Sequence, residues 1–495
     1  MTASHHFLDG NFAPVHEGRD LAALEVTGVL PAGLAGTLYR VGPNPQFAPR
    51  DASYHWFAGD GMVHAFTFDG GQVAYRNRWM RTPKWQLEYE AGRALFGTYG
   101  NPATTDPAVL GQSTGTANTN IVAHGGRLFA LEESHQPFEF DPHTLASKGY
   151  QSFGGVVAAR FTAHPKVDAA TGELHFFAYS VDGPGTTAMQ YGVLDRHCRV
   201  TRLDNFEAPY PAMVHDFATT AHHVLFPIMP LTSSMERAMH GQPMFAWEDE
   251  RIVHLGLLAK GAAIDTLRWI DTGPCHVFHF MNAWEADGII TVYALEALTA
   301  PGMPHADGRP GDPARSAARL TRWRIDPRGA GRLEHTILDD VPAEFPRIDE
   351  RFTGRENRYG WTLCHADGAI RSEADNARYG TLACHDFHSG DTRRFTLPAG
   401  DVLSEPVFAP RHAEAAEGDG WILATAWRAQ RQRTDLLVFD GTDVASGPLA
   451  QVHLPCRIPF GFHGAWLAAA CLPTAGGTSS GSPSFSASLR ASNGA

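Results

Sequence analysis

The chain has 495 residues, of which 43% are hydrophobic and 19% are charged, and its formal net charge is −13. This composition is typical of a globular protein with a large core, and the scattered arginines exclude a basic nucleic-acid-binding surface. Six cysteines without a C-x-x-C pair exclude a disulfide framework, and the absence of an eighteen-residue apolar run excludes a spanning helix. With no basic-then-apolar leader at the N-terminus, the expected location is cytoplasmic.

Short apolar runs separated by D-G and G-G dipeptides recur along the chain. Each run rich in Val, Ile, Phe, Tyr or Trp predicts a strand, and a strand followed by such a dipeptide and another strand predicts a hairpin. Helical periodicity is limited to residues 84–97 and 233–240. The clearest strand-forming runs are, in order, residues 62–80 (MVHAFTFDGGQVAYRNRWM), 120–133, 172–183, 420–428 and 435–443.

The pattern predicts an all-β fold of many short strands. A chain of this length must either split or close on itself, and a closed propeller removes exposed strand edges. No clean internal repeat is visible, so a pair of β-sandwiches remains the rival architecture. We expect one domain over residues 1–472. Residues 473–495 are rich in Gly and Ser and predict a disordered tail.

Four histidines lie in similar surroundings, each within two residues of an apolar or aromatic side chain and near a strand-to-turn change. They are His164 in FTAHPKVD, His215 in MVHDFATT, His279 in CHVFHFMNAWE and His463 in PFGFHGAWL. Neutral imidazoles that converge on a propeller axis would bind Fe, Zn, Cu or Ni. A single histidine in an apolar setting is more often a hydrogen-bonded core residue, and the long spacing does not decide between the two.

The sequence resembles the carotenoid cleavage oxygenases from GTLYRVGPNPQFAP (36–49) to RIPFGFHGAW (457–466). The resemblance implies a seven-bladed β-propeller whose loops and short helices cap an axial Fe(II) held by His164, His215, His279 and His463. His279 is chosen over His276 because the family ligand lies three residues before the Asn of N-A-W-E. The strongest similar stretches are HWFAGDGMVHAF (55–66), GTANTN (115–120), FTAHPKVD, MVHDFATT, FHFMNAWE, EFPRID (344–349) and SEPVFAPR (404–411).

The resemblance also implies residues around the ligands. Three glutamates, at matching positions Glu133, Glu344 and Glu405, would accept ring N–H groups from the histidines and offset the charge of the metal. Thr119 matches a threonine whose methyl group partly blocks a remaining iron position. Without the resemblance, each glutamate would be read as a surface salt-bridge residue.

The implied reaction inserts both atoms of O2 across a conjugated C=C bond and yields two carbonyl products. It needs no reductant, and the chain has no dinucleotide fingerprint, flavin motif or iron–sulfur cysteine pattern. Polyene isomerisation on the same centre would consume no O2. A non-catalytic propeller scaffold is the remaining alternative, because fold alone does not imply function.

The sequence favours a small hydrophobic aryl alkene, such as a stilbenoid or phenylpropanoid, over an apocarotenoid or carotenoid. The aryl-alkene branch holds its ring with residues that match Phe57 and Tyr99, and it binds the 4-hydroxyl with a lysine whose place is taken here by Glu132. A glutamate can only accept a hydrogen bond from a neutral phenol, so phenolate-assisted activation is in doubt. The negative charge and the lack of a Lys-rich amphipathic helix argue against peripheral membrane contact.

Overall fold

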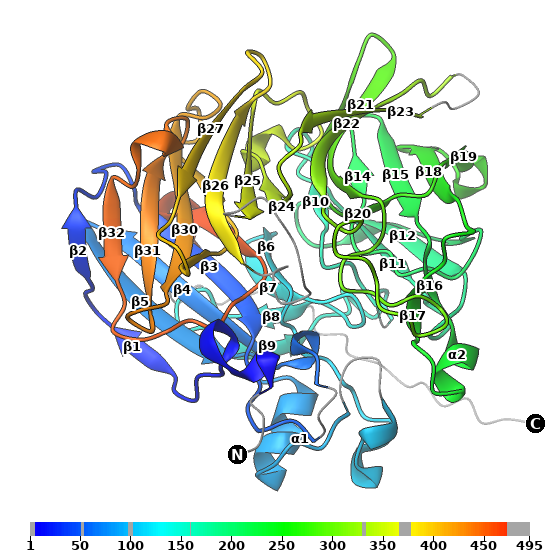
Figure 1. Cartoon of the computed structure of the whole chain (residues 1–495), viewed down its shortest axis with the longest axis horizontal. Helices are drawn as coiled ribbons and strands as arrows, with labels where there is room; N and C mark the ends of the chain where they lie inside the picture. Colours follow the sequence, from blue (N-terminus) through cyan, green and yellow to red (C-terminus); the bar gives the residue numbers. More distant parts are fainter. Residues whose placement is uncertain are drawn as a thin grey trace, which may run out of the picture.

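The computed structural model describes residues 5–50, 54–97, 102–158, 160–328, 333–365 and 378–472. Seven antiparallel sheets are arranged around a central axis, each contributing one blade (Figure 1). The predicted seven-bladed β-propeller is therefore confirmed, and the rival pair of sandwiches is wrong. The predicted domain of residues 1–472 includes all seven blades, and the predicted tail lies outside the described residues.

Five blades have four strands each, and within each blade hydrogen bonds join the strands in their order along the chain. They are β6 (Asn120–His124), β7 (Arg127–Leu131), β8 (Phe138–Phe140) and β9 (Ser147–Tyr150); β10 (Lys166–Val167), β11 (Leu174–Tyr179), β12 (Ala188–Leu194) and β13 (Val200–Glu207); β14 (Ala218–Thr219), β15 (His223–Ile228), β18 (Val253–Ala259) and β19 (Arg268–Thr272); β20 (His276–Ala286), β21 (Ile289–Ala297), β22 (Arg319–Ile325) and β23 (Leu333–Asp339); and β24 (Ala343–Arg347), β25 (Tyr359–His365), β26 (Tyr379–Asp386) and β27 (Asp391–Thr396).

The two remaining blades join the ends of the chain and close the ring. One contains β1 (Arg19–Leu21), β5 (Gln72–Trp79), β4 (Gly61–Asp69), β3 (Gly36–Pro43) and the last strand, β33 (Gly464–Ala468). The other contains β2 (Glu25–Gly28), β32 (Ala450–His453), β31 (Arg433–Asp440), β30 (Gly420–Arg428), β28 (Val402–Leu403) and β29 (Val407–Pro410). Pairing of β33 with β3 and of β2 with β32 leaves the ring without an open seam.

The hydrophobic core fills the spaces between adjacent blades. One cluster joins side chains from β25 and β26 with side chains from β30 and β31, and another joins β18 to β20 through β22. The largest fully buried side chains include Trp247, Trp323, Trp361 and Trp421. Each such side chain stabilises the fold by about 1.5–3 kcal/mol through its removal from water.

Short helices lie outside the blades. The predicted helix over residues 84–97 is shorter than expected: α1 runs Pro83–Ala91, with Thr82 accepting a hydrogen bond from the backbone N–H of Trp85 and Gly92 ending the helix at φ 67°. The helix predicted over residues 233–240 is α2 (Met235–Met239), and it lies in the connection between β16 (Leu231–Ser233) and β17 (Phe245–Trp247), which form a two-stranded ribbon. These helices lie at the lower edge of the view in Figure 1.

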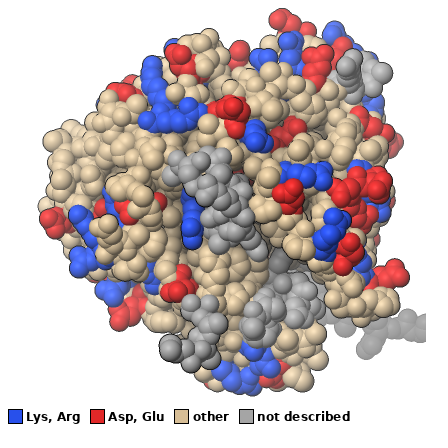
Figure 2. Space-filling view, in the orientation of Figure 1, with Lys and Arg blue, Asp and Glu red and all other residues tan. Residues whose placement is uncertain are grey.

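In Figure 2, acidic and basic side chains lie among one another on the face shown. Within the described ranges, no helix is long and apolar enough to cross a membrane.

Candidate metal centre and substrate cavity

Four blades each bring one of the predicted histidines to the axis. His164 precedes β10, His215 lies just before β14, His279 is on β20, and His463 directly precedes β33. Each is on or beside the innermost strand of its blade, where chain segments from different blades meet. Residues that are 300 positions apart in the sequence therefore become neighbours.

The ligand atoms of these four histidines lie within 4.8 Å of one another. The Nε2 atom of His215 is 2.9 Å from Nε2 of His164 and 3.2 Å from Nε2 of His279. Two imidazoles at right angles on a metal, with metal–nitrogen bonds of about 2.1 Å, would place their nitrogens about 3.0 Å apart. The observed separations fit such a donor set, so the four residues can hold one transition-metal ion.

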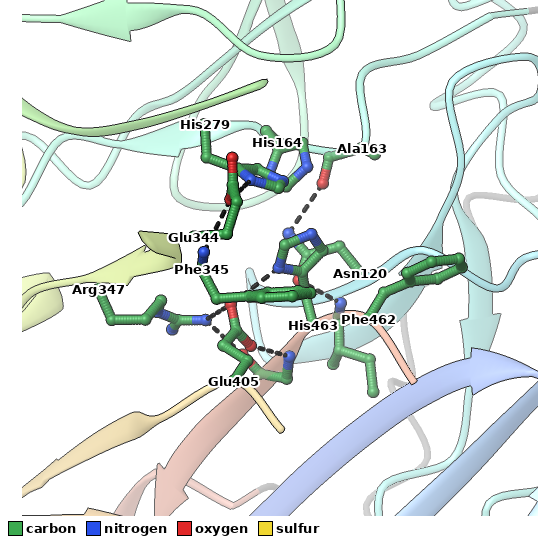
Figure 3. A network of polar contacts seen from close by, with 12 residues as sticks. Asn120, Ala163, His164, His279, Glu344, Phe345, Arg347, Glu405, Phe462 and His463 are labelled. Atoms are coloured by element: carbon green, nitrogen blue, oxygen red, sulfur yellow. Dashed lines mark hydrogen bonds and ion pairs between the residues drawn. The ribbon is translucent and has the colours of Figure 1, made fainter. Parts of the chain in front are cut away.

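Three carboxylates select the tautomer of three of these histidines. Glu133 accepts a hydrogen bond from Nδ1 of His215. Glu344 accepts one from Nδ1 of His279 at 2.6 Å, and Glu405 accepts one from Nδ1 of His463 at 2.8 Å (Figure 3). A proton on Nδ1 leaves the lone pair on Nε2 free for a metal. The structure thus brings together all four predicted ligands and all three predicted glutamates.

The fourth histidine, His164, has a different environment. Burial, followed by the charges of the other three histidines, holds its pKa well below the usual value, so the ring is neutral. The preceding residue is held in place because Asn120 donates a hydrogen bond from Nδ2 to the carbonyl oxygen of Ala163 at 2.8 Å (Figure 3).

Local irregularities of the strands decide which side chains face the axis. Register shifts around Val277 and Phe280 interrupt the pairing of β20 with β21, and His279 lies between them. His276, on the same strand, is buried outside the cluster, and its Nδ1 has no hydrogen-bond partner among the described residues. On β24, a second irregularity follows Glu344, where Phe345 adopts φ 54° and donates its N–H to Glu344 Oε2 at 2.7 Å. A bulky residue in the left-handed region is uncommon and marks a constrained site.

Next to the metal centre is a cavity of about 490 Å3, which is within the range for sites that enclose small organic ligands. Eleven Phe, Tyr and Trp residues line it, including Trp56, Phe57 and Phe462. The ring centroids of Phe57 and Phe462 are 5.5 Å apart in an edge-to-face arrangement. Thr119 also lines the cavity, and its hydroxyl donates to Asn118 Oδ1 at 2.9 Å. Tyr99, the other predicted ring-binding residue, lies outside the described residues.

The profile of the retinal pigment epithelial membrane protein family matches residues 12–468. The chain belongs to the carotenoid cleavage oxygenase family. It is 37% identical over 473 residues to isoeugenol monooxygenase of Pseudomonas nitroreducens, covering 93% of this chain and 97% of the relative. It is 34% identical to lignostilbene-alpha,beta-dioxygenase isozyme III of Sphingomonas paucimobilis, covering 95% and 99%. The crystal structure of Pseudomonas brassicacearum lignostilbene dioxygenase superposes with a TM-score of 0.89 at 34% identity, covering 94% and 99%.

These relatives confirm the predicted class of enzyme. The chain is an alkene-cleaving oxygenase of the carotenoid cleavage type. The reading of the propeller as a non-catalytic scaffold is accordingly wrong.

In this member of the carotenoid cleavage oxygenase family, Glu132 lines the cavity, but both of its carboxylate oxygens already accept hydrogen bonds from neighbouring residues. Oε1 accepts from the backbone N–H groups of Thr116 and Ala117, at 2.9 and 3.2 Å, and from the Tyr150 hydroxyl at 3.1 Å. Oε2 accepts from the Thr116 hydroxyl at 3.1 Å, and His135 Nδ1 is 3.4 Å from Oε1. Burial raises the pKa of Glu132, but His135 and these hydrogen bonds outweigh it, so the net shift is downward and the group is ionised.

Sequence reasoning missed several residues that complete the oxygenase site. Arg347 lies 3.0 Å from Glu405 Oε1, and Arg40 Nη1 lies 3.9 Å from Oε2. Tyr179 donates its hydroxyl to Glu133 Oε2 at 2.5 Å. Arg347 belongs to the EFPRID stretch that contains Glu344. Its place three residues after a predicted site residue could have indicated that it also belongs to the site. Arg40 is on β3, a strand buried on both faces, where a charged residue requires a buried partner.

Proposed function

We propose that the protein is a non-heme Fe(II) oxygenase that uses O2 to cleave the conjugated C=C bond of a stilbenoid or phenylpropanoid aryl alkene into two carbonyl products. The observation that supports this most is the four-histidine cluster at the wall of an aromatic-lined cavity. The curated relatives named for isoeugenol and lignostilbene, both aryl alkenes, support the substrate class.

In this proposal, His164, His215, His279 and His463 hold the iron through Nε2. Bound Fe(II) would supply the binding and activation of O2 beside the alkene. Glu133, Glu344 and Glu405 hold the Nδ1 protons of their histidines and offset positive charge at a site that is removed from water. The alkene supplies the electrons, so both oxygen atoms leave in the two carbonyl products and no reductant is consumed.

The aromatic wall would orient the substrate. Phe57 and Phe462 offer ring edges and faces to an aryl group. The hydroxyl of Thr119 is bonded to Asn118, and its methyl group would narrow access to the metal. Tyr99 keeps its proposed role beside the aryl ring. The six cysteines are free, which supports the proposed cytoplasmic location.

An apocarotenoid is the second candidate substrate. Structures of Synechocystis apocarotenoid oxygenase, including a cobalt-substituted form, superpose with a TM-score of 0.83 at 26% identity. The chain also lacks the lysine of the aryl-alkene branch, because Glu132 occupies that position.

Product analysis with O2 uptake on the Fe(II)-loaded protein separates these substrates. The panel contains a 4-hydroxystilbene, an isoeugenol-like propenylphenol, its 4-O-methyl ether and an apocarotenal. We expect aromatic aldehyde from the phenols and no product from the apocarotenal. Cleavage of the apocarotenal alone would contradict the aryl-alkene proposal, and isomerised polyene without O2 uptake would contradict cleavage itself. Equal turnover of the methyl ether would show that the phenol hydroxyl is not recognised by Glu132.

A further inference from the structure

Arg160 is a cation at the wall of the cavity with no counterion. Its side chain is half-buried and lines the cavity, and no described residue forms a hydrogen bond or ion pair with its guanidinium. The other cation of the cavity wall differs. Lys84 is buried and bonded to Asp60 at 2.6 Å and to Glu88 at 3.0 Å, so its charge is balanced within the protein.

One acidic group of the same cavity wall, Glu132, is not available to Arg160. Glu132 is committed to the hydrogen bonds of Thr116, Ala117 and Tyr150 and to its contact with His135. Burial lowers the pKa of His135, but Glu132 raises it by more. The charge of Arg160 also lowers this pKa, which indicates that Arg160 lies near the His135 ring. Glu132 is therefore paired with His135, whereas no described residue pairs with Arg160.

Arg160 is also within reach of a substrate at the metal centre. It is four positions before His164 in the chain, so even a fully extended segment spans no more than about 13–14 Å between the two Cα atoms. The flexible arginine side chain shortens the remaining gap. An aryl alkene whose double bond lies at the histidine cluster can therefore present a ring substituent to the guanidinium.

We propose that Arg160 binds a carboxylate group on the aryl alkene, so that the preferred substrate is an anionic, carboxylate-bearing stilbenoid or phenylpropanoid. This inference rests on the proposed function, since it names the substrate class of the same site. A guanidinium presents parallel N–H donors that match a carboxylate, and in a mostly apolar cavity such a charge-assisted pair is stronger than in water. Arg160 is a specificity-determining residue, because the lysine position of the aryl-alkene branch holds the fully bonded Glu132.

The test compares a 4-hydroxystilbene carrying a 4′-carboxylate with its methyl ester on the Fe(II)-loaded protein. Because a hydrogen bond to a charged group is the interaction removed, we expect Arg160→Met to raise KM for the carboxylate by about 10-fold to 100-fold. The kcat for the carboxylate and both constants for the ester should stay near the wild-type values. Arg160→Lys should restore part of the loss. Arg309→Met, at an exposed arginine whose ion pair within the described residues is with Asp307, is the matched control. It should change neither KM nor kcat for either substrate.

Binding of a saturated analogue distinguishes failure of this inference from failure of the proposed function. Calorimetry with the bibenzyl carboxylate and its methyl ester needs no turnover. Tighter binding of the carboxylate by the wild-type protein, lost in Arg160→Met, supports the inference even if no stilbene is cleaved. Equal binding of acid and ester by the wild-type protein, or an equal loss of both in Arg160→Met, would overturn it even if both stilbenes are cleaved.

Discussion

Two sides of the metal centre use the same histidine–glutamate pair in different electrostatic surroundings. On one side, Glu405 is 1% exposed and contacts Arg347 as well as His463. On the other side, Glu344 bonds to His279 and to the N–H of Phe345, its Oε1 has no hydrogen-bond partner, and no Lys or Arg of the described chain pairs with it.

The pKa values of the two histidines follow this difference. Burial lowers the pKa of His463 to about 4, and the opposing effect of Glu405 does not overcome it. Burial also lowers the pKa of His279, but there Glu344 outweighs burial and the net shift is upward. The negative charge of Glu405 is shared with buried arginines, whereas the charge of Glu344 is left for the metal. The same kind of histidine–glutamate hydrogen bond can therefore stabilise the fold on one side of a site and offset the positive charge of a metal on the other.

The largest expected effect comes from removing one of the four proposed metal ligands. His215→Ala removes such a ligand and leaves Glu133 without its imidazole partner. Because even changes to groups around the ligands weaken metal binding 10- to 100-fold, we expect iron binding to fall by more than about tenfold, with loss of alkene cleavage. Iron per protein chain, measured by plasma emission spectrometry, checks this. His222→Ala, at an exposed histidine seven residues away, should retain wild-type iron.

Glu405→Gln should damage stability more than metal binding. The substitution keeps a hydrogen-bond acceptor for His463 but removes the buried carboxylate beside Arg347 and Arg40, and leaves Arg347 only its ion pair with Glu350. Breaking a buried ion pair typically costs about 3–5 kcal/mol, so we expect a loss of that order in the free energy of unfolding. Urea unfolding of the metal-free protein measures it. An unchanged unfolding midpoint would mean that the arginines do not depend on Glu405.

The stability contributed by Glu405 should depend on pH. Burial raises its pKa, but Arg347 and His463 outweigh burial and lower it from 4.5 to about 2 in the folded protein. Its contribution is therefore complete above pH 4.5 and is lost as pH falls toward 2. By linkage, the stability gap between wild type and Glu405→Gln should shrink by about 1.4 kcal/mol between pH 7 and pH 3.5. Urea unfolding at both pH values checks this, and a constant gap would contradict it.

Glu344→Gln should give the reverse pattern and the smallest effect on stability. Glutamine keeps an acceptor for His279 Nδ1 but removes the charge that no arginine offsets. We expect iron affinity to fall about 10- to 100-fold, with a change in unfolding free energy below about 1 kcal/mol. Competition with a chelator measures the affinity. If Glu344→Gln and Glu405→Gln lose iron equally, the two sides are electrostatically equivalent.

Much of the fold was readable because strand and turn signals are local. Apolar runs divided by D-G and G-G predicted the hairpins of β4–β5 and β6–β7. The blade count came from resemblance rather than pattern, because no repeat period is visible. Helix α1 ends earlier than expected, since Gly92 in a left-handed conformation stops it.

The sequence by itself determined which residue types are available for chemistry: four histidines and three glutamates, each in a stretch similar to a known family. Only the tertiary structure decided how their charges are balanced. Arg347 and Arg40 neutralise Glu405 because strands β24 and β3, distant in sequence, meet near the axis. Likewise, the hydrogen bonds that occupy Glu132 come from Thr116, Ala117 and Tyr150, which lie beside it only once the β6–β9 blade has folded. Burial and electrostatic balance depend on which segments are neighbours in space, and a linear pattern contains no direct record of that.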